Sequence, residues 1–152
     1  MYRRVTFITC LALILFTGVL QAQGQFTIHA ASAEPVAVWQ KMDVGDKSVW
    51  VNPTPALTSA DLERAIPERS PEGRNSVTTV FTEAGAKKMR EFSASQIDKL
   101  IAMVMDGKVI FAPRVRSVLP GPERTAVITG NGPTGLTIEQ VQRILVSINR
   151  QK

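Results

Sequence analysis

The dipeptide Asp106-Gly107 stands between two apolar runs, and it constrains the fold of this chain more than any other feature. The runs cover residues 100–105 (LIAMVM) and 108–112 (KVIFA). A two-residue type I′ turn needs positive φ at both central positions, and Asp-Gly adopts that turn readily. We therefore expect an antiparallel β-hairpin that turns at Asp106-Gly107.

Further elements are expected on both sides of the hairpin. Residues 48–52, 76–81 and 124–129 are rich in β-branched side chains and are typical of strands. Thr82 is placed to cap a helix over residues 83–95, with an acidic residue in the first turn. The sequence thus predicts strands before and after one capped helix.

The final helix has the strongest start signal. Thr137 and Gln140 form a capping-box pair, and Leu136 and Val141 occupy the two positions of a hydrophobic staple. One apolar face follows at helical spacing. Its members are Ile138, Val141, Ile144, Leu145 and Ile148.

The order of these elements predicts an α+β fold. We expect a small antiparallel sheet with two helices packed on one face, which is a two-layer, ferredoxin-like arrangement. This domain is placed at residues 48–152, with a charged loop at 67–75. Residues 25–47 are polar and Ala-rich and are interpreted as a tether.

The N-terminus is typical of a secretory signal peptide. Arg3 and Arg4 precede an apolar run over residues 5–20, and small residues follow. We assign residues 1–24 to this signal, with cleavage after Gly24 or after Ala33. The run is shorter than the roughly 20 residues of a membrane span. The expected location is periplasmic or secreted after Sec export, and the alternative is a membrane anchor formed by an uncleaved segment.

Composition and motifs disfavour several classes of site. The formal net charge is +5, too small to indicate a nucleic-acid surface. Cys10 lies in the apolar run and His29 is the only histidine, so we expect no metal site and no cofactor. The stretch from Gly130 to Gly135 matches G-x-G-x-x-G, but a dinucleotide site also needs an acid on a second strand about 20 residues further on. We interpret it as a loop that leads into the last helix.

No pattern of catalytic residues stands out. The chain has 13 carboxylates, but no two have a spacing that forces them together on a buried face. No G-x-S-x-G surrounds a serine. The chain is therefore expected not to be an enzyme, and a hydrolase built on surface carboxylates stays as a third alternative.

Residues 81–119 resemble the head subdomain of the large periplasmic domain of the SecD/SecDF family. The matching stretches are Phe-Thr-Glu at 81–83, Gly-Ala-Lys-Lys at 85–88, Asp-Gly-Lys-Val at 106–109 and Ala-Pro at 112–113. Further matches at 56–61, 126–130 and 136–140 extend the resemblance to about residues 48–150. It implies a head-like fold that is exported by itself and contacts emerging polypeptide. It implies no catalytic residues, and neither translocation nor proton coupling.

The resemblance leads to two functional hypotheses. The first is a non-catalytic module that binds protein or extended polypeptide, in translocation with the Sec machinery or in envelope quality control. A groove beside the hairpin or an exposed strand edge would take the segment. The second is an envelope scaffold or a regulatory subunit of a membrane complex.

We select candidate binding residues around the hairpin. They are Val109, Phe111, Arg114, Val115 and Arg116. Met89 and Phe92 on the first helix are further lining candidates, although core packing explains them better. For Arg114, Arg116 and Arg124 the alternative is protection of a sheet edge by charge.

Overall fold

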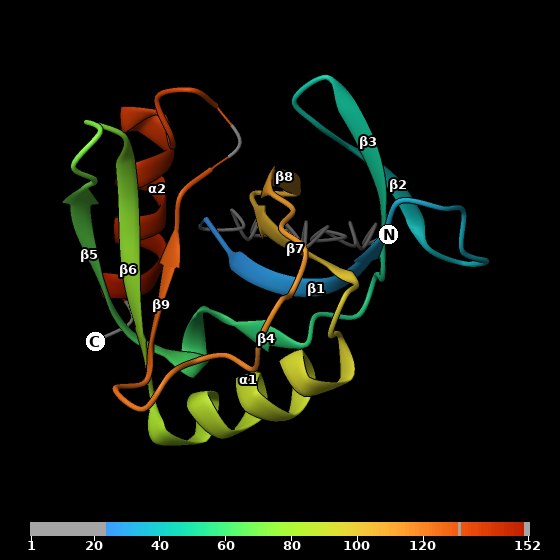
Figure 1. Ribbon diagram of the computed structural model, residues 1–152, viewed down its shortest axis with the longest axis horizontal. Coiled ribbons are helices and arrows are strands. Elements are labelled where there is room, and N and C mark those ends of the chain that lie inside the picture. Colours follow the sequence, from blue (N-terminus) through green and yellow to red (C-terminus); the bar gives the residue numbers. More distant parts are fainter. Residues whose placement is uncertain (1–23, 131, 151–152) are drawn as a thin grey trace, which may run out of the picture.

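The computed structural model describes residues 24–130 and 132–150, and its largest element is a six-stranded antiparallel sheet (Figure 1). The strands are β1 (Phe26–Ser32), β2 (Gln40–Val44), β3 (Lys47–Val51), β4 (Leu57–Thr58), β7 (Leu100–Met105) and β8 (Lys108–Phe111). Their order is β2-β3-β1-β7-β8, and β4 pairs with β1. Because β2 and β8, the two ends of this order, lie next to each other, the sheet forms a nearly closed barrel.

A second sheet and two helices complete the fold. The sheet has the order β5-β6-β9, with β5 (Leu62–Arg69), β6 (Asn75–Phe81) and β9 (Thr125–Ile128). Helix α2 (Ile138–Asn149) packs on β5 and β6 and also reaches β1. Helix α1 (Glu83–Ser95) contacts β4, β6 and the 3₁₀ turn η1 (Ser59–Asp61), and in Figure 1 it runs below both sheets.

Strand β7 separates two hydrophobic cores. Ile101, Met103 and Met105 point into the larger core, which lies between the barrel, the second sheet and the helices. Ala102 and Val104 point the other way, into the barrel interior. Successive side chains of a strand alternate between its faces, so an uninterrupted apolar run indicates burial on both faces. The run at 100–105 is apolar throughout because β7 is buried on both faces.

The predicted two-layer, ferredoxin-like fold is wrong. Nine strands lie in two sheets among the described residues, and the two helices contact different parts of them. The prediction assumed that every strand had one buried face and one exposed face. The barrel adds a second buried face, and it includes strands β1 and β2, which were not predicted from the sequence.

The predicted tether at residues 25–47 is also wrong, and the fold begins well before residue 48. Strand β1 pairs with β3, β4 and β7 and lies in the middle of the larger sheet. Its polar side chains Thr27 and His29 suggested exposure, but both are buried. His29 Nε2 lies 2.8 Å from Thr27 Oγ1, and Nδ1 lies 2.8 Å from the Asn52 carbonyl oxygen. These partners replace the water that buried polar groups would otherwise need.

The hairpin and both helix starts are confirmed. Asp106 and Gly107 have φ of 51° and 75°, as a type I′ turn requires. Thr82 accepts a hydrogen bond from the Gly85 N–H, and Thr137 and Gln140 form the capping box. Two details differ from the prediction. Ile138 is 67% exposed and lies off the apolar face, and residues 67–69 of the expected loop belong to β5.

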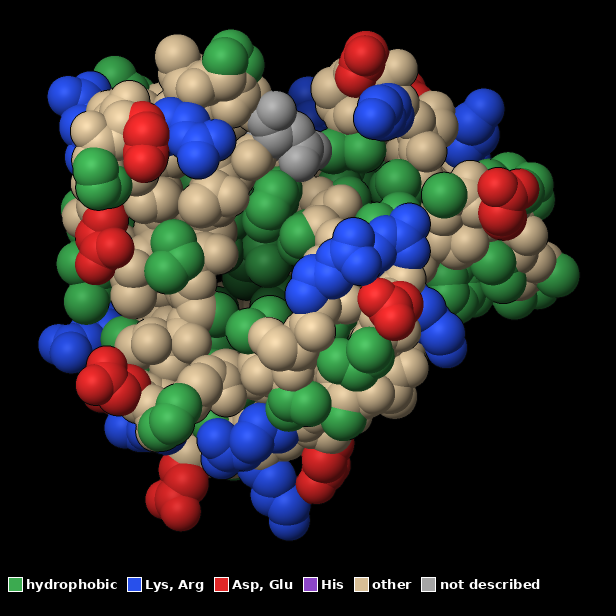
Figure 2. Space-filling view, viewed as in Figure 1, with side chains coloured by type: hydrophobic (Ala, Val, Ile, Leu, Met, Phe, Trp, Pro, Cys, Tyr) green, Lys and Arg blue, Asp and Glu red, His purple; other side chains and the backbone are tan. Residues whose placement is uncertain are grey.

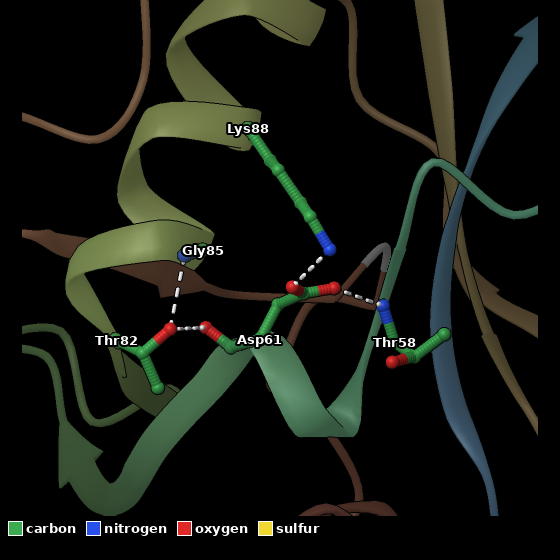
Figure 3. A network of polar contacts seen from close by, with 5 residues as sticks. All are labelled: Thr58, Asp61, Thr82, Gly85 and Lys88. Carbon is green, nitrogen blue, oxygen red and sulfur yellow. Dashed lines mark hydrogen bonds and ion pairs between the residues drawn. The ribbon is translucent and has the colours of Figure 1, made fainter.

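A polar junction fixes α1 against η1 (Figure 3). The Asp61 carboxylate accepts the Thr58 N–H at 3.0 Å and the Lys88 ammonium at 2.7 Å. The Asp61 carbonyl accepts the Thr82 N–H at 3.0 Å. A Cβ at Gly85 would lie 1.9 Å from that carbonyl oxygen, so only glycine permits this close approach. The junction holds the start of α1 at the end of β6.

The predicted signal peptide at 1–24 lies, except for Gly24, outside the described residues. Within residues 24–130 and 132–150 no helix has the length and apolar character that a bilayer crossing requires.

Candidate functional site

An apolar cavity of about 270 Å³ lies between the two sheets. Figure 2 shows it as a hollow in the middle of this face, with hydrophobic side chains inside and Lys or Arg side chains along one rim. We call it the central cavity. Strands β1, β6, β7, β8 and β9, helix α1 and the segment after β8 all contribute to it. Its apolar lining is Phe26, Ile28, Phe81, Met89, Ile101, Met103, Phe111, Pro113, Val115, Leu119, Ala126, Val127 and Ile128.

One border of the central cavity is the free edge of β9. The Phe81 N–H donates to the Arg124 carbonyl at 2.8 Å, and Thr79 Oγ1 donates to the Ala126 carbonyl at 2.9 Å. Main-chain groups of alternate residues in an antiparallel strand point the same way. Those of Thr125 and Val127 therefore point away from β6, where no strand of the described chain pairs with β9. An extended segment could pair with these groups.

The opposite border is the segment over residues 113–117. The Ile101 N–H donates to the Pro113 carbonyl at 3.0 Å, and the Val115 N–H donates to the Lys99 carbonyl at 2.9 Å. The Asp98 N–H donates to the Val115 carbonyl, also at 2.9 Å. The segment thus continues the pairing of β8 with the start of β7. This pairing gives the cavity a wall that is hydrogen-bonded to the start of β7.

Two arginines of this segment belong to the cavity lining. Arg114 donates to the Asp98 carbonyl oxygen, and the Arg116 guanidinium lies 3.3 Å from the Asp98 carboxylate. The lining also contains the hydroxyl residues Thr79, Ser117 and Thr129, and it contains neither Asp nor Glu. The cavity is therefore apolar inside and positively charged at one rim.

Four of the five predicted binding residues meet at the central cavity. They are Phe111, Arg114, Val115 and Arg116. Of the two helix candidates, Met89 lines the cavity as well as the core, whereas Phe92 packs against the core and is not part of the lining. What these residues bind stays a prediction.

Val109 lies elsewhere, inside the barrel. Its partner is Val104, whereas Phe111 is paired with Met103, because the ladder between β7 and β8 carries a bulge at this point. A bulge inserts an extra residue and so changes which residues share a face. Simple alternation places Val109 and Phe111 on the same face, and the bulge separates them.

Other residues considered in the sequence have structural positions. Arg124 donates to the Phe81 carbonyl at 3.1 Å and pairs with Glu63 at 3.4 Å. A Cβ at Gly135 would lie 2.3 Å from the Asn75 carbonyl oxygen, so this glycine is needed for packing of the loop before α2 on β6. Within the two described ranges, no three His, Cys, Asp or Glu side chains gather as metal ligands would.

Comparison with known proteins decides the family. The sequence model of the family described as "SecDF, P1 head subdomain" matches residues 36–142. This is more than half of the chain. The chain belongs to the SecDF P1 head subdomain family.

Curated relatives of this head subdomain are SecD and SecDF proteins. A protein translocase subunit SecDF of Thermus thermophilus is 42% identical over 76 residues, which cover 50% of this chain and 10% of that protein. A protein translocase subunit SecD of Acidaminococcus fermentans is 39% identical over 75 residues, or 49% of this chain and 18% of that protein. The matched half of the chain thus spans less than a fifth of each of these relatives.

Solved structures show the same head subdomain fold. One, described as SecDF, a membrane component that enhances protein export, has a TM-score of 0.62 at 24% identity and covers 83% of this chain and 62% of that chain. SecDF in a super-membrane-facing form has a TM-score of 0.62 at 23% identity, over 83% of this chain and 18% of that chain. At these identities the likeness concerns the fold alone.

Proposed function

We propose that this head subdomain binds extended segments of unfolded polypeptide during protein translocation, and that it catalyses no reaction. The observation that supports this most directly is the free edge of β9 beside the central cavity. Strand addition to such an edge supplies main-chain hydrogen bonds that do not depend on sequence, and an adjacent pocket takes one side chain. Such a site suits a partner whose sequence varies.

The family membership supports the same proposal. The curated relatives are translocase subunits, and one solved relative is described as enhancing protein export. We further propose that the domain works in the periplasm, with Sec components or the exported polypeptide as partners. Fusion of the chain to a reporter that is active only after export tests the location, and an inactive fusion contradicts it.

Peptide binding to the full chain tests the main proposal. Fluorescently labelled, terminally blocked extended peptides with one large apolar side chain should bind with anisotropy changes that saturate. Methylation of the peptide nitrogens on one strand edge should abolish binding, because it removes the donors that face β9. Methylation on the other edge is the matched control and should leave binding intact. Equal effects of the two methylation patterns would contradict strand addition.

A substitution that fills part of the central cavity is a second test of the proposed binding site. Ala126→Leu places extra methyl groups in the lining and should weaken binding at least about tenfold, which is about 1.4 kcal/mol, without lowering the melting temperature. Val146→Leu adds volume to an exposed position of α2 that is not part of the lining and is the control. Unchanged peptide affinity in a folded Ala126→Leu variant would place the bound segment elsewhere.

A further inference from the structure

The central cavity carries a charge that the proposed function does not use. Arg114 and Arg116 lie in its lining, and no carboxylate does. In the described part of the chain Arg114 has no ion-pair partner, and its guanidinium donates to the Asp98 carbonyl oxygen. An occupant that is only apolar would leave this guanidinium without a carboxylate.

Asp98 neutralises the rim in part. Its carboxylate pairs with Arg116 at 3.3 Å, and both side chains are about three-quarters exposed, at 73% and 75%. Exposed ion pairs of this kind are weak, and ligand carboxylates compete with them readily. Two arginines against one aspartate leave the rim with a net positive charge. A guanidinium that already donates to a carbonyl retains further N–H donors for a carboxylate.

Strand geometry relates this charge to the cavity. A segment added to the free edge of β9 is itself a strand, so its side chains at positions i and i+2 point to the same side. If one apolar side chain enters the cavity, the side chains two positions before and after it lie over the border of the cavity. The side chains of its immediate neighbours in the segment point away from the cavity. The residue two positions from the anchor is therefore the one placed to meet the rim.

We infer that the site prefers extended segments in which an aspartate or glutamate lies two residues from a large apolar anchor. This inference rests on the proposed function and adds the class of segment that is preferred. The positive rim, the apolar interior and the alternation of an added strand each contribute to it. An internal acidic side chain, rather than a chain terminus, is the committed partner, because an added strand runs past the cavity in both directions.

Binding of a peptide series to the full chain tests the inference. All peptides are terminally blocked and carry one phenylalanine. One set has aspartate two positions from the phenylalanine on either side, a second set has asparagine there, and a third set has aspartate next to the phenylalanine. We expect the better of the two same-side aspartate peptides to bind about two- to fivefold more tightly than its asparagine counterpart at low salt. The difference should shrink at high salt.

Variants of the chain test whether Arg114 and Arg116 cause the preference for aspartate. The double variant Arg114→Gln/Arg116→Gln should bind aspartate and asparagine peptides equally, and the corresponding double lysine variant should restore the preference. Arg143→Gln on α2, outside the cavity lining, is the matched control and should retain it.

The possible results bear separately on the preference for aspartate, on its spacing from the anchor, on the two arginines and on the proposed function. Equal binding of all peptides by the unmodified chain overturns the preference and leaves the proposed function standing. Tighter binding of the peptides with aspartate two positions from the phenylalanine supports the spacing, provided that the asparagine peptides and the peptides with adjacent aspartate bind equally. Equal binding of both aspartate sets overturns the spacing, and an unaltered preference in the double glutamine variant overturns the role of the arginines. Failure of every peptide to bind contradicts the proposed function itself.

Discussion

His29 is a buried polar residue in a part of the chain that the sequence predicted to be a tether. It lies in the central strand β1, is only 8% exposed, and is held by Thr27 and the Asn52 carbonyl. Burial lowers the pKa of His29 from its usual 6.5, and the hydrogen bond with the Asn52 carbonyl opposes this only in part. The neutral form of the ring is therefore the one that the folded state prefers.

This preference predicts a dependence of stability on pH. Because the pKa of His29 is lower in the folded state, the unfolded state binds more protons between that lowered value and about 6.5. The contribution of His29 to stability is complete above 6.5 and is lost as the pH falls through that window. We expect the free energy of unfolding in urea to be lower at pH 5 than at pH 7.5. In His29→Gln this histidine-dependent part of the slope should disappear, and an identical slope in the variant would assign it to other groups.

The elements of this fold follow local signals where those signals are complete. Capping residues define the start of both helices, and Asp106-Gly107 defines the hairpin. The hairpin of β2 and β3 has a comparable signal, Gly45-Asp46 between two short runs, and this pair could have revealed it. Strand β5 lies at the edge of its sheet. It can contain Pro67 because proline has no backbone N–H, and the outward-facing N–H groups of an edge strand have no partner strand.

Two buried serines in the helices give an element-scale prediction. Ser93 on α1 accepts the Leu119 N–H at 2.9 Å and lies 3.1 Å from the Leu119 carbonyl. Ser147 on α2 is buried, and its hydroxyl has no hydrogen-bond partner among the residues that the structure describes. A buried hydroxyl without a partner costs about 1 kcal/mol or more, and alanine is also the better helix former. Ser147→Ala should therefore raise the free energy of unfolding by about 1 kcal/mol.

Ser93→Ala is the matched comparison and should lower the free energy of unfolding by about 1–3 kcal/mol, since it leaves the Leu119 N–H unsatisfied. Chemical denaturation of both variants measures the two effects. If both substitutions change the free energy of unfolding in the same direction, the difference in hydrogen bonding does not determine the effect of these serines on stability.

The whole molecule is organised around a strand that serves two cores. Met103 faces the core between the layers and Val104 faces the barrel interior. A sheet with one buried face would tolerate truncation at one of two consecutive positions. Here both Met103→Ala and Val104→Ala should lower the free energy of unfolding, each by about 2 kcal/mol or more.

Val127→Ala is the control for this pair, because Val127 is 52% exposed at the free edge, and it should change stability little. Equilibrium unfolding of the three variants gives the comparison. Tolerance of Val104→Ala would contradict a filled barrel interior.

Local signals in the sequence were enough to predict the hairpin turn, the two capped helices and the strands at 48–52, 76–81 and 124–129. These signals act between neighbours in the chain, so one sequence is enough to read them. Four of the five candidate binding residues line the central cavity, because they lie in the hairpin or directly after it; that they bind a partner stays a prediction.

Three features depend on tertiary packing. They are the environment on each face of β7, the barrel that β1 and β2 complete, and the position of Val109 inside that barrel. The physical reason is that the burial of Thr27 and His29 depends on the pairing of β1 with β7, which is far away in the sequence. The bulge between β7 and β8 is local, but the run of apolar residues does not reveal it. The central cavity, with the free edge of β9 on one border and two arginines on the other, also depends on tertiary packing, because these segments meet only when the two sheets pack.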